Sequence, residues 1–350
     1  MADNSRIPVA VLTGFLGSGK TTLLRKLLEE PSMNRTAVLI NEFGEIGIDH
    51  LLVKSVLEGA VVLQNGCICC TLRTDLRDGI ASIIDSRYAG KFPDFDRIVV
   101  ETTGLADPAP IAQTLLIDPM LRNQVSLANI IATVDGMLGA EQLNTHDESL
   151  RQAAVADRLV ITKTDMIAPD RTQALKSALS RLNPAARIFD VHANGFNAAA
   201  LVTGGVSDPK TKLAEVQHWL TSAKQEYSHD EKGHHHNGDH IHLGDNHSVN
   251  IQSCSLRVEE EIDWTAFSIW LTLLLHRHGG KILRVKGLLR VTDATGPIIL
   301  HAVQHVIHPP IHLEQWPDDD HASRIVFIVQ GVNPAVLQRS LMSYLRASTR

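Results

Sequence analysis

The stretch that decides the fold reads Gly14-Phe15-Leu16-Gly17-Ser18-Gly19-Lys20-Thr21. It has the form G-x-x-x-x-G-K-[ST], and it lies between an apolar run, Val9–Leu12, and a helical pattern, Thr21–Glu30. Glycines in such a loop let backbone N–H groups curl around phosphate oxygens, and the N-terminus of the following helix favours anions. The spacing of its three glycines does not match the dinucleotide pattern G-x-G-x-x-G. The sequence therefore predicts a loop that binds a nucleoside triphosphate.

The side chains of this loop have separate expected roles. Lys20 would reach the β- and γ-phosphates, and the hydroxyl of Thr21 would bind Mg²⁺. Both are therefore candidate catalytic residues. The candidate nucleotide-binding residues here are Gly14, Gly17, Ser18, Gly19, Lys20, Thr21 and Thr22.

The pattern of apolar runs around the loop predicts an α/β fold, a doubly wound and mostly parallel sheet. Short continuous runs such as Ile98–Val100 are typical of strands buried on both faces, and helical segments separate them. The expected strands are Val9–Leu12, Thr36–Ile40, Ala60–Leu63, Arg97–Val100, Asn129–Val134, Leu159–Ile161 and Ala186–Val191, and expected helices include Thr21–Glu30, Thr74–Arg87 and Arg171–Leu182.

A second part of the predicted nucleotide site follows the run Arg97–Val100. This run leads into Glu101, and Gly104 comes three residues later. A carboxylate at the end of a buried strand can hold the hydration shell of Mg²⁺, and a glycine N–H at that spacing can sense the γ-phosphate. We therefore add Glu101 to the candidate catalytic residues and Gly104 to the nucleotide-binding residues.

A third part, Thr162-Lys163-Thr164-Asp165, follows the run Leu159–Ile161. Ligands of open α/β sheets bind at the carboxyl ends of the strands. The Asp165 carboxylate can accept both N1–H and the N2 amine of guanine, a donor pair that adenine lacks, and the stem of Lys163 can lie across the base. Thr162, Lys163 and Asp165 therefore favour GTP over ATP. Thr162 replaces the Asn of the usual N-K-x-D pattern, which leaves one supporting hydrogen bond open.

Three of the four cysteines lie within four positions, at Cys67, Cys69 and Cys70. In an extended chain Cys67 and Cys69 share one side, whereas in a helical turn Cys67 and Cys70 converge. Either pair supplies thiolates for Zn²⁺, Co²⁺ or Cu⁺. A closed structural zinc site needs a second pair of ligands and none is evident, so the sequence predicts an open site suited to exchange. The alternative is that these cysteines are simply core residues.

An acidic segment, Asn41–His50, directly follows the expected strand Thr36–Ile40. Its place in the chain fits a switch loop near the γ-phosphate. Glu42 or Glu45 could also lend a carboxylate to the transition metal. A solvated acidic loop without a ligand is the alternative.

The composition is that of an ordinary globular protein. Apolar residues make up 44% and charged residues 21% of the chain, which excludes wholesale disorder. A net charge of −6 gives no indication of a nucleic acid or membrane partner. The longest nearly apolar run, Ala266–Leu275, is shorter than the roughly 20 residues that a membrane span needs. The clustered cysteines and the absence of a signal-peptide pattern favour the cytoplasm.

With 350 residues, the chain has room for a second domain. Residues 227–250 are polar, rich in Gly and His and without periodicity, which predicts a flexible linker. We expect a nucleotide-binding domain at 1–226 and a small α+β domain at 251–350. Its expected strands are Ile251–Arg257, Lys281–Val291, Ile298–Val306 and Ser323–Val329, its helices Trp264–His276 and Asn333–Leu345, and a helix Lys212–Lys224 precedes the linker.

Seven of the 18 histidines lie between His229 and His247. Neutral imidazole binds Zn²⁺, Co²⁺ and Ni²⁺, so this tract could gather ions and load the cysteine site. A hydrophilic linker without that role is the alternative. The auxiliary metal candidates are His234, His235, His236, His240 and His242, whereas for His301, His305, His308 and His312 we expect packing or partner contact.

In order along the chain, the motifs GFLGSGKTTLL (14–24), NEFGEIGID (41–49), CICC (67–70), ETTGLADP (101–108) and TKTD (162–165) resemble the CobW/YjiA-type metallochaperone GTPases of the SIMIBI class. The resemblance covers nearly the whole chain, because Leu283–Gly287 and Trp316–Asp320 are similar to the family's C-terminal domain. The C-x-C-C cluster and the E-x-x-G ending, in place of D-x-x-G, are its most specific features.

The resemblance implies a GTPase that uses GTP and Mg²⁺ to deliver a transition metal to a client metalloprotein. The cysteines would hold the ion, and GTP hydrolysis would release it. Zinc is the commonest cargo in such proteins. The alternatives are a cobalt chaperone for corrin synthesis and a metal-buffering GTP-binding protein without insertion activity. A homodimer is a further expectation.

The residue directly after Gly104 is Leu105 and not a glutamine that could position a water molecule. We therefore expect hydrolysis to be slow without metal or client. A metabolite kinase on the same loop is a weaker alternative, because no acceptor-binding residues are evident.

Overall fold

The computed structural model describes residues 6–41, 60–63, 71–203, 213–217, 219–220 and 251–348. The chain divides into two compact units. The first contains residues 1–175 and 188–205, and the second contains residues 176–187 and 206–350.

The first unit is built on a seven-stranded sheet with the order β3-β2-β4-β1-β5-β6-β7. The neighbouring pairs from β3 to β6 are all parallel. Each predicted strand is confirmed, with ends that differ from the prediction by no more than a few residues. The strands are β1 (Ile7–Gly14), β2 (Thr36–Asn41), β3 (Ala60–Leu63), β4 (Arg97–Glu101), β5 (Val125–Asp135), β6 (Arg158–Thr162) and β7 (Arg187–Asp190).

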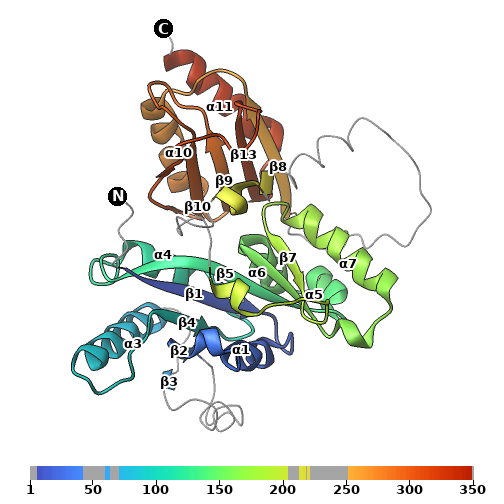
Figure 1. Ribbon diagram of the computed structural model, residues 1–350. Coiled ribbons are helices and arrows are strands. Elements are labelled where there is room, and N and C mark those ends of the chain that lie inside the picture. Colours follow the sequence, from blue (N-terminus) through green and yellow to red (C-terminus); the bar gives the residue numbers. More distant parts are fainter. Residues whose placement is uncertain are drawn as a thin grey trace. The chain divides into compact units, whose positions relative to one another are not determined.

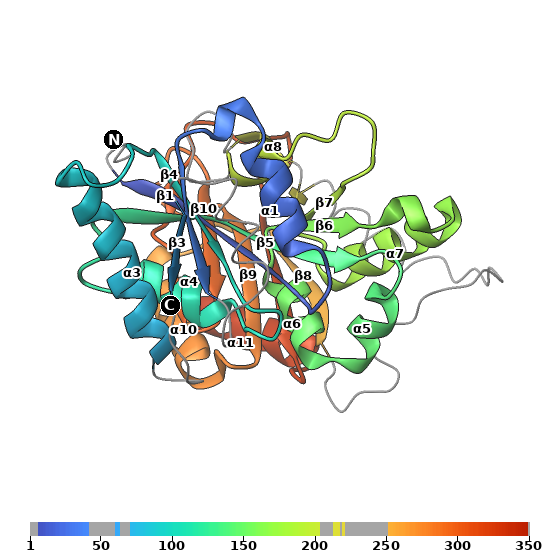
Figure 2. The same ribbon diagram turned by 90° about the horizontal axis from the view of Figure 1, so that it is seen from below.

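Helices connect these strands, and the three that were predicted are confirmed as α1 (Lys20–Leu28), α3 (Thr71–Tyr88) and α7 (Pro169–Leu182). Figures 1 and 2 show α1 and α3 on opposite sides of the β2–β3 end of the sheet. The structure adds α4 (Ala109–Ile117), α5 (Gly139–Thr145), α6 (Asp147–Val155) and α8 (Ala199–Val202), with short 3₁₀ turns at Pro31–Met33 and Thr164–Met166.

One face of the sheet is closed by α1 and α8. Leu23, Leu24 and Leu27 of α1 pack with Leu201 and Val202 of α8 in a buried cluster. The strand residues of the same cluster include Ala10, Leu12, Val38, Ile40, Val99, Ile131 and Val160. Apolar residues on both faces of the sheet account for the continuous apolar runs in the sequence.

The second unit holds a six-stranded sheet in which β8, β13, β9, β10 and β11 pair in that order and β12 pairs with β10, all antiparallel. Helices α10 and α11 contact each other and pack on one face. The predicted α+β fold is thus confirmed. The elements are β8 (Ile251–Val258), α10 (Trp264–His278), β9 (Ile282–Leu289), β10 (Ile298–Val303), β11 (Val306–Ile307), β12 (Ile311–His312), β13 (Ser323–Gln330) and α11 (Pro334–Ser348).

The prediction of one strand over Ile298–Val306 is wrong, because the chain reverses there. Gln304 takes the left-handed conformation with φ 49°, and Val303 pairs with Val306 in an antiparallel hairpin. The expected helix Lys212–Lys224 is confirmed within its described part, since residues 213–217 and 219–220 are helical. Val216 and Trp219 pack against Leu288 and Val326 on the other face of the sheet.

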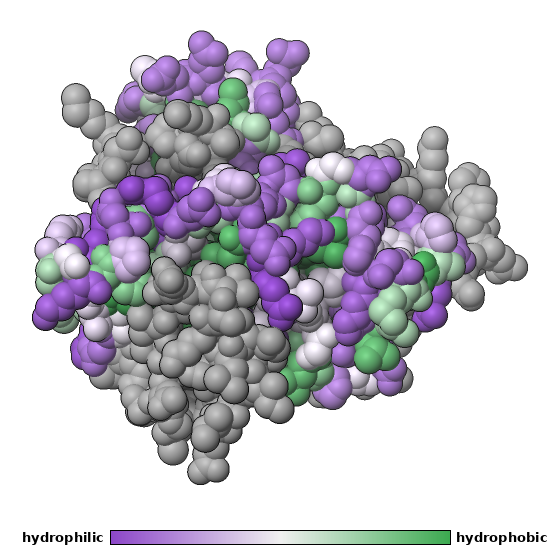
Figure 3. Space-filling model, turned by 60° about the horizontal axis from the view of Figure 1, so that its bottom comes forward, coloured by the Kyte–Doolittle hydropathy of each residue, from purple (hydrophilic) through white to green (hydrophobic). Residues whose placement is uncertain are grey.

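None of the helices in the described segments combines the length and apolarity of a membrane span. On the face shown in Figure 3, hydrophilic side chains predominate, and apolar side chains form separate patches.

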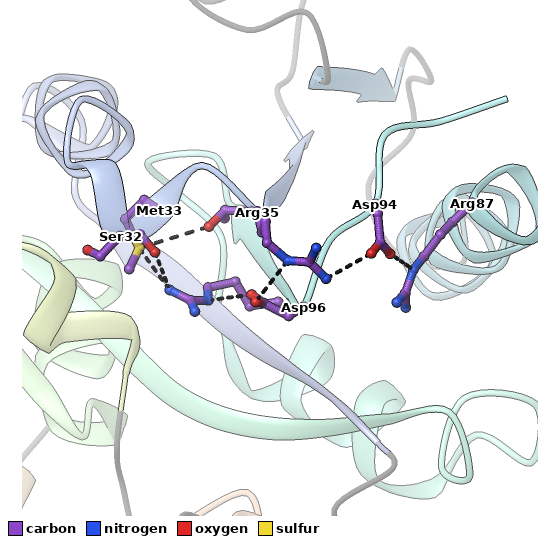
Figure 4. Close-up of polar contacts among 8 residues, drawn as sticks. Ser32, Met33, Arg35, Arg87, Asp94 and Asp96 are labelled. Atoms are coloured by element: carbon purple, nitrogen blue, oxygen red, sulfur yellow. Dashed lines mark hydrogen bonds and ion pairs between the residues drawn. The ribbon is translucent and has the colours of Figure 1, made fainter. Parts of the chain in front are cut away.

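An ion-pair network ties α3 to the amino ends of β2 and β4 (Figure 4). Asp94 accepts from Arg87 of α3 at 2.6 Å and from Arg35 at 2.8 Å. Asp96 in turn lies 3.3 Å from Arg35 and 3.1 Å from Arg97. The side chains of Asp94, Asp96 and Arg35 are each about half exposed, so dissolved salt can screen the network.

We expect Asp94→Asn to lower the thermal unfolding temperature modestly, and to do so less at high salt. The pKa of the Asp94 carboxyl lies below its usual value, mainly because Arg87 donates a hydrogen bond to it. Such a group stabilises the fold above its unfolded pKa of about 3.9, and the effect disappears as pH falls through the lower folded value. Calorimetry at several pH values should therefore show that the unfolding temperatures of the variant and the unmodified protein become equal at pH values below the folded pKa of Asp94.

The matched control is Asp85→Asn, which removes an exposed carboxylate of the same helix. Asp85 makes no ion pair with any residue that the structure describes. An equal loss of stability in both variants would show that the network around Asp94 contributes nothing specific.

Candidate functional site

The predicted nucleotide motifs meet at the carboxyl edge of the parallel sheet. β1, β4, β5 and β6 end at Gly14, Glu101, Asp135 and Thr162, and these strands are neighbours in the sheet. This is the edge at which open α/β sheets bind ligands. The structure therefore brings together three segments that lie far apart in the sequence.

Buried hydroxyl groups hold the predicted phosphate-binding loop, Gly14–Thr21, which is called the phosphate loop below. Ser18 is fully buried, and its hydroxyl lies 2.7 Å from the carbonyl of Phe15 and 2.6 Å from Oγ1 of Thr133 in β5. Gly14 has φ +140°, and a Cβ there would lie 2.6 Å from the Thr133 carbonyl oxygen. The loop passes so close to β5 that only glycine fits. The backbone N–H of Ser18 also donates to the Phe15 carbonyl, at 3.1 Å, so both polar groups of Ser18 hold the shape of the loop.

Gly19 and Thr22 lie at the start of α1. Gly19 is the N-cap residue with φ 87°, and Thr22 is exposed in the first turn. No side chain caps this helix end. The free backbone N–H groups and the helix dipole make this N-terminus a suitable place for an anion.

Lys20, Thr21 and Glu101 form the polar centre of the site. The Lys20 ammonium lies over the loop, 3.0 Å from the carbonyl of Gly14 and 3.2 Å from that of Phe15. The Thr21 hydroxyl donates to Oε1 of Glu101 at 2.7 Å. Glu101 is 5% exposed at the end of β4. A hydroxyl and a buried carboxylate at hydrogen-bond distance are hard oxygen donors of the kind that Mg²⁺ prefers.

The loop after β4 runs directly against the phosphate loop. A Cβ on Gly104 would lie 2.6 Å from Cδ2 of Leu16 and 2.8 Å from its backbone nitrogen. Thr102 holds the start of the loop, since its hydroxyl donates to Thr13 at 2.9 Å. Gly104 is therefore placed beside the phosphate loop, as its predicted role requires.

Thr162 supplies the hydrogen bond that the sequence left open. Its hydroxyl donates to the Ser18 carbonyl at 2.8 Å and lies 3.3 Å from that of Val134. Its methyl group packs 3.4 Å from the Cβ position of Gly19. A threonine in place of asparagine thus still joins the strand before the predicted base-binding segment to the phosphate loop.

Lys163 is held by Asp135, a residue that sequence reasoning did not select. The Lys163 ammonium lies 2.6 Å from Oδ2 of Asp135, a carboxylate that is 1% exposed. The other oxygen of Asp135 accepts from the N–H groups of Met137 and Leu138 at 2.8 and 3.1 Å. Lys163 has φ 53°, a conformation that costs energy in a residue other than glycine. The ion pair holds this backbone and the lysine stem in one arrangement.

Asp165, the expected guanine acceptor, lies at the surface beside His192. Its Oδ1 is 3.0 Å from Nε2 of His192, and about half of the Asp165 side chain is exposed. Thr164 between the two motif residues donates to Asp190 at 2.6 Å. The carboxylate therefore remains accessible to a base at the edge of the sheet.

The candidate ligands of the transition metal lie outside the described residues. They are Glu42, Cys67, Cys69, Cys70, His234, His235, His236, His240 and His242. Gly17 is described and lies in the phosphate loop with φ 71°. Within the described segments, no group of three or more His, Cys, Asp or Glu side chains could hold a metal ion.

The later histidines pack within the second unit, as expected. The rings of His301 and His308 lie 5.9 Å apart, and His301 is 5% exposed. His305 donates through Nδ1 to the Leu275 carbonyl at 2.8 Å. These contacts give a structural role to three of the four histidines.

Asp135→Asn should weaken GTP and GDP binding by the same factor, about tenfold, the scale of one hydrogen bond to a charged group. Asparagine keeps an oxygen for the N–H groups of Met137 and Leu138 but leaves Lys163 without its counter-charge. Calorimetric titration of both nucleotides measures the effect. Asp157→Asn is the control, because Asp157 accepts from Ile130 at 3.0 Å elsewhere in the same sheet. If the variant lost affinity for GTP alone, Asp135 would not act at the part of the site that contacts the base (the base end).

Two family models match the chain. The model described as CobW/HypB/UreG, nucleotide-binding domain, matches residues 8–190. The model described as Cobalamin synthesis protein cobW C-terminal domain matches residues 251–345.

Similar proteins cover about two thirds of the chain or more. The zinc chaperone YjiA of Escherichia coli is 31% identical over 322 residues, covering 92% of this chain and 93% of that protein. The zinc chaperone CobW of a Sinorhizobium species is 29% identical, covering 66% of this chain and 72% of that protein. The crystal structure of Zn(II)-bound YjiA GTPase from E. coli, 25% identical, superposes with a TM-score of 0.66 over 97% of this chain and 99% of that one. The chain thus belongs to the CobW/HypB/UreG family of P-loop GTPases and carries the CobW-type C-terminal domain.

Proposed function

We propose that the protein is a metallochaperone that binds Zn²⁺ at Cys67, Cys69 and Cys70 and passes it to a client apoprotein in a GTP-dependent step. The names of the similar proteins support this proposal, since two are zinc chaperones and one solved relative is Zn(II)-bound. The observation that carries it is the position of the cysteines in the chain relative to the carboxyl edge of the parallel sheet. The nucleotide motifs meet at this edge, which is called the nucleotide edge below.

The cysteine cluster falls between two described elements, β3 and α3. β3 ends at Leu63 beside β2, at the same edge of the sheet as Gly14 and Glu101. α3 begins at Thr71, directly after Cys70. The chain therefore visits the nucleotide edge immediately before it reaches the cysteines. This order supports a metal site that responds to the state of the nucleotide.

The two kinds of metal ion call for different donors. The oxygens of Thr21 and Glu101 suit Mg²⁺, whereas thiolates suit a softer cargo ion. When bound, Mg²⁺ would neutralise charge on the β- and γ-phosphates. Lys20 would add positive charge at the same phosphates, and the N–H groups at the start of α1 would orient them. The protein's part in hydrolysis is therefore to position and neutralise the phosphates.

Slow turnover without metal or client is part of the proposal. Leu105, directly after Gly104, has a side chain that is 54% exposed and cannot orient a water molecule by hydrogen bonding. A client or a second copy of the chain could complete the site. The protein would work in the cytoplasm, without nucleic acid or membrane partners, and the histidine tract would serve as a collecting arm for ions.

Zn²⁺ should bind with different affinity to the GTP-bound and GDP-bound forms. A ligand shifts an equilibrium between two states only when it binds them unequally, and the coupling is reciprocal. Competitive titration at buffered free metal, with a GTP analogue that is not hydrolysed and then with GDP, measures the difference. Equal affinities would exclude GTP-controlled release and favour a metal buffer. Tighter binding of Co²⁺ than of Zn²⁺ at cellular free-metal levels would favour the cobalt alternative.

The double variant Cys67→Ala with Cys69→Ala should lose tight Zn²⁺ binding and keep its nucleotide affinity within about twofold, because thiolates are the strong ligands for this ion. The control is Cys254→Ala, which removes the thiol of β8. Tight binding that survives in the double variant would place the metal in the histidine tract instead.

A further inference from the structure

Gln152 of α6 reaches the loop that follows β4, and no motif in the sequence points to it. Its side-chain nitrogen donates to the carbonyl of Gly104 at 3.1 Å and to that of Ala106 at 3.0 Å. The residue is 1% exposed. The two acceptors also fix which end of the amide is which, because an amide oxygen facing two carbonyl oxygens would be repelled.

These two hydrogen bonds hold the loop on both sides of Leu105. In a trans peptide the C=O and N–H groups point in opposite directions. With the Gly104 carbonyl turned toward Gln152, the N–H of the same peptide, that of Leu105, points away from α6. On its other side Gly104 lies against the backbone of Leu16 in the phosphate loop. Gly104 is thus held between α6 and the phosphate loop.

The glutamine side chain has one energetic cost beside the two hydrogen bonds that it makes. Its side-chain oxygen is buried and has no hydrogen-bond partner among the residues that the structure describes. A buried acceptor without a partner destabilises a protein, whereas an apolar side chain of similar size would leave the carbonyls of Gly104 and Ala106 without these two donors. What the glutamine provides is the pair of donors to the loop.

We propose that Gln152 is a positioning residue, which holds Gly104 beside the phosphate loop so that the protein binds GTP in preference to GDP and hydrolyses it. The inference rests on the proposed role of Gly104 as the sensor of the γ-phosphate. α6 packs against β1 and β5, the strands that lead into the phosphate loop and Asp135, so Gln152 is anchored to the rigid part of the site.

In the full-length protein, Gln152→Leu should lower both the affinity for a non-hydrolysable GTP analogue and kcat by about tenfold, the scale of two neutral buried hydrogen bonds. The affinity for GDP should change by less than about twofold, because GDP has no γ-phosphate for the loop to sense. Isothermal titration and phosphate release measure these quantities.

Gln152→Glu provides a readout that a purely structural role would not give. A carboxylate facing two carbonyl oxygens repels them, whereas its protonated form can donate one hydrogen bond. We therefore expect kcat of this variant to rise as pH is lowered from 8 toward about 6, relative to the unmodified protein, since burial raises a carboxyl pKa.

The matched control is Leu150→Ala, which removes a side chain that is 2% exposed in the same helix. It should lower the unfolding temperature and leave the ratio of the two nucleotide affinities unchanged. The inference is overturned if Gln152→Leu weakens GDP and the GTP analogue equally, leaves both unchanged, or tightens the GTP analogue.

A further variant separates this inference from the role of Gly104 itself. In Gly104→Ala the new methyl group meets Leu16, so sensing of the γ-phosphate should be lost. If Gly104→Ala abolishes the preference for GTP and Gln152→Leu does not, only the role of Gln152 fails. If Gly104→Ala keeps the preference, the proposed sensor is wrong, and the inference fails with it.

Discussion

The nucleotide edge depends on buried hydroxyl groups that join the phosphate loop to the strands around it. The Ser18 hydroxyl meets Thr133 of β5, the Thr162 hydroxyl reaches the Ser18 carbonyl, and Thr102 donates to Thr13. A loop that presents most of its N–H groups to an anion needs further hydrogen bonds to keep its shape, beyond the one from the Ser18 N–H to the Phe15 carbonyl. The threonines and the serine therefore supply the hydrogen bonds that keep the loop in shape. The positions of Lys20, Thr21 and Gly104 all follow from that shape.

The order of the elements could be predicted because each part of it is local. A strand buried on both faces gives a continuous apolar run, and the glycines of the phosphate loop have a fixed spacing. The seven strands of the first sheet were found this way. The hairpin at Gln304 was missed because Ile298–Val306 is apolar enough to pass for one strand, and the left-handed residue that turns the chain is not a glycine.

The side chains that support the site were harder to find because they act over long separations in the sequence. Asp135 pairs with a lysine 28 residues further along, and Gln152 bonds to a carbonyl 48 residues before it. Asp135 did leave a signal, since it is an acid at the end of an apolar run, as Glu101 is. Gln152 left none, because a glutamine inside a helix is ordinary until the fold shows which loop it faces.

The pairing of Lys163 with Asp135 has a consequence for the electrostatics of the whole edge. The ammonium lies 2.6 Å from a buried carboxylate, so the pair is close to neutral and contributes little to the long-range field. Among the described residues of this edge, Lys20 and the start of α1 then supply the attraction of a nucleotide from a distance, whereas Lys163 and Asp135 act on the base by contact. The dependence of the association rate on ionic strength thus reports on the phosphate end of the site, and the dissociation rate reports on the fit of the base.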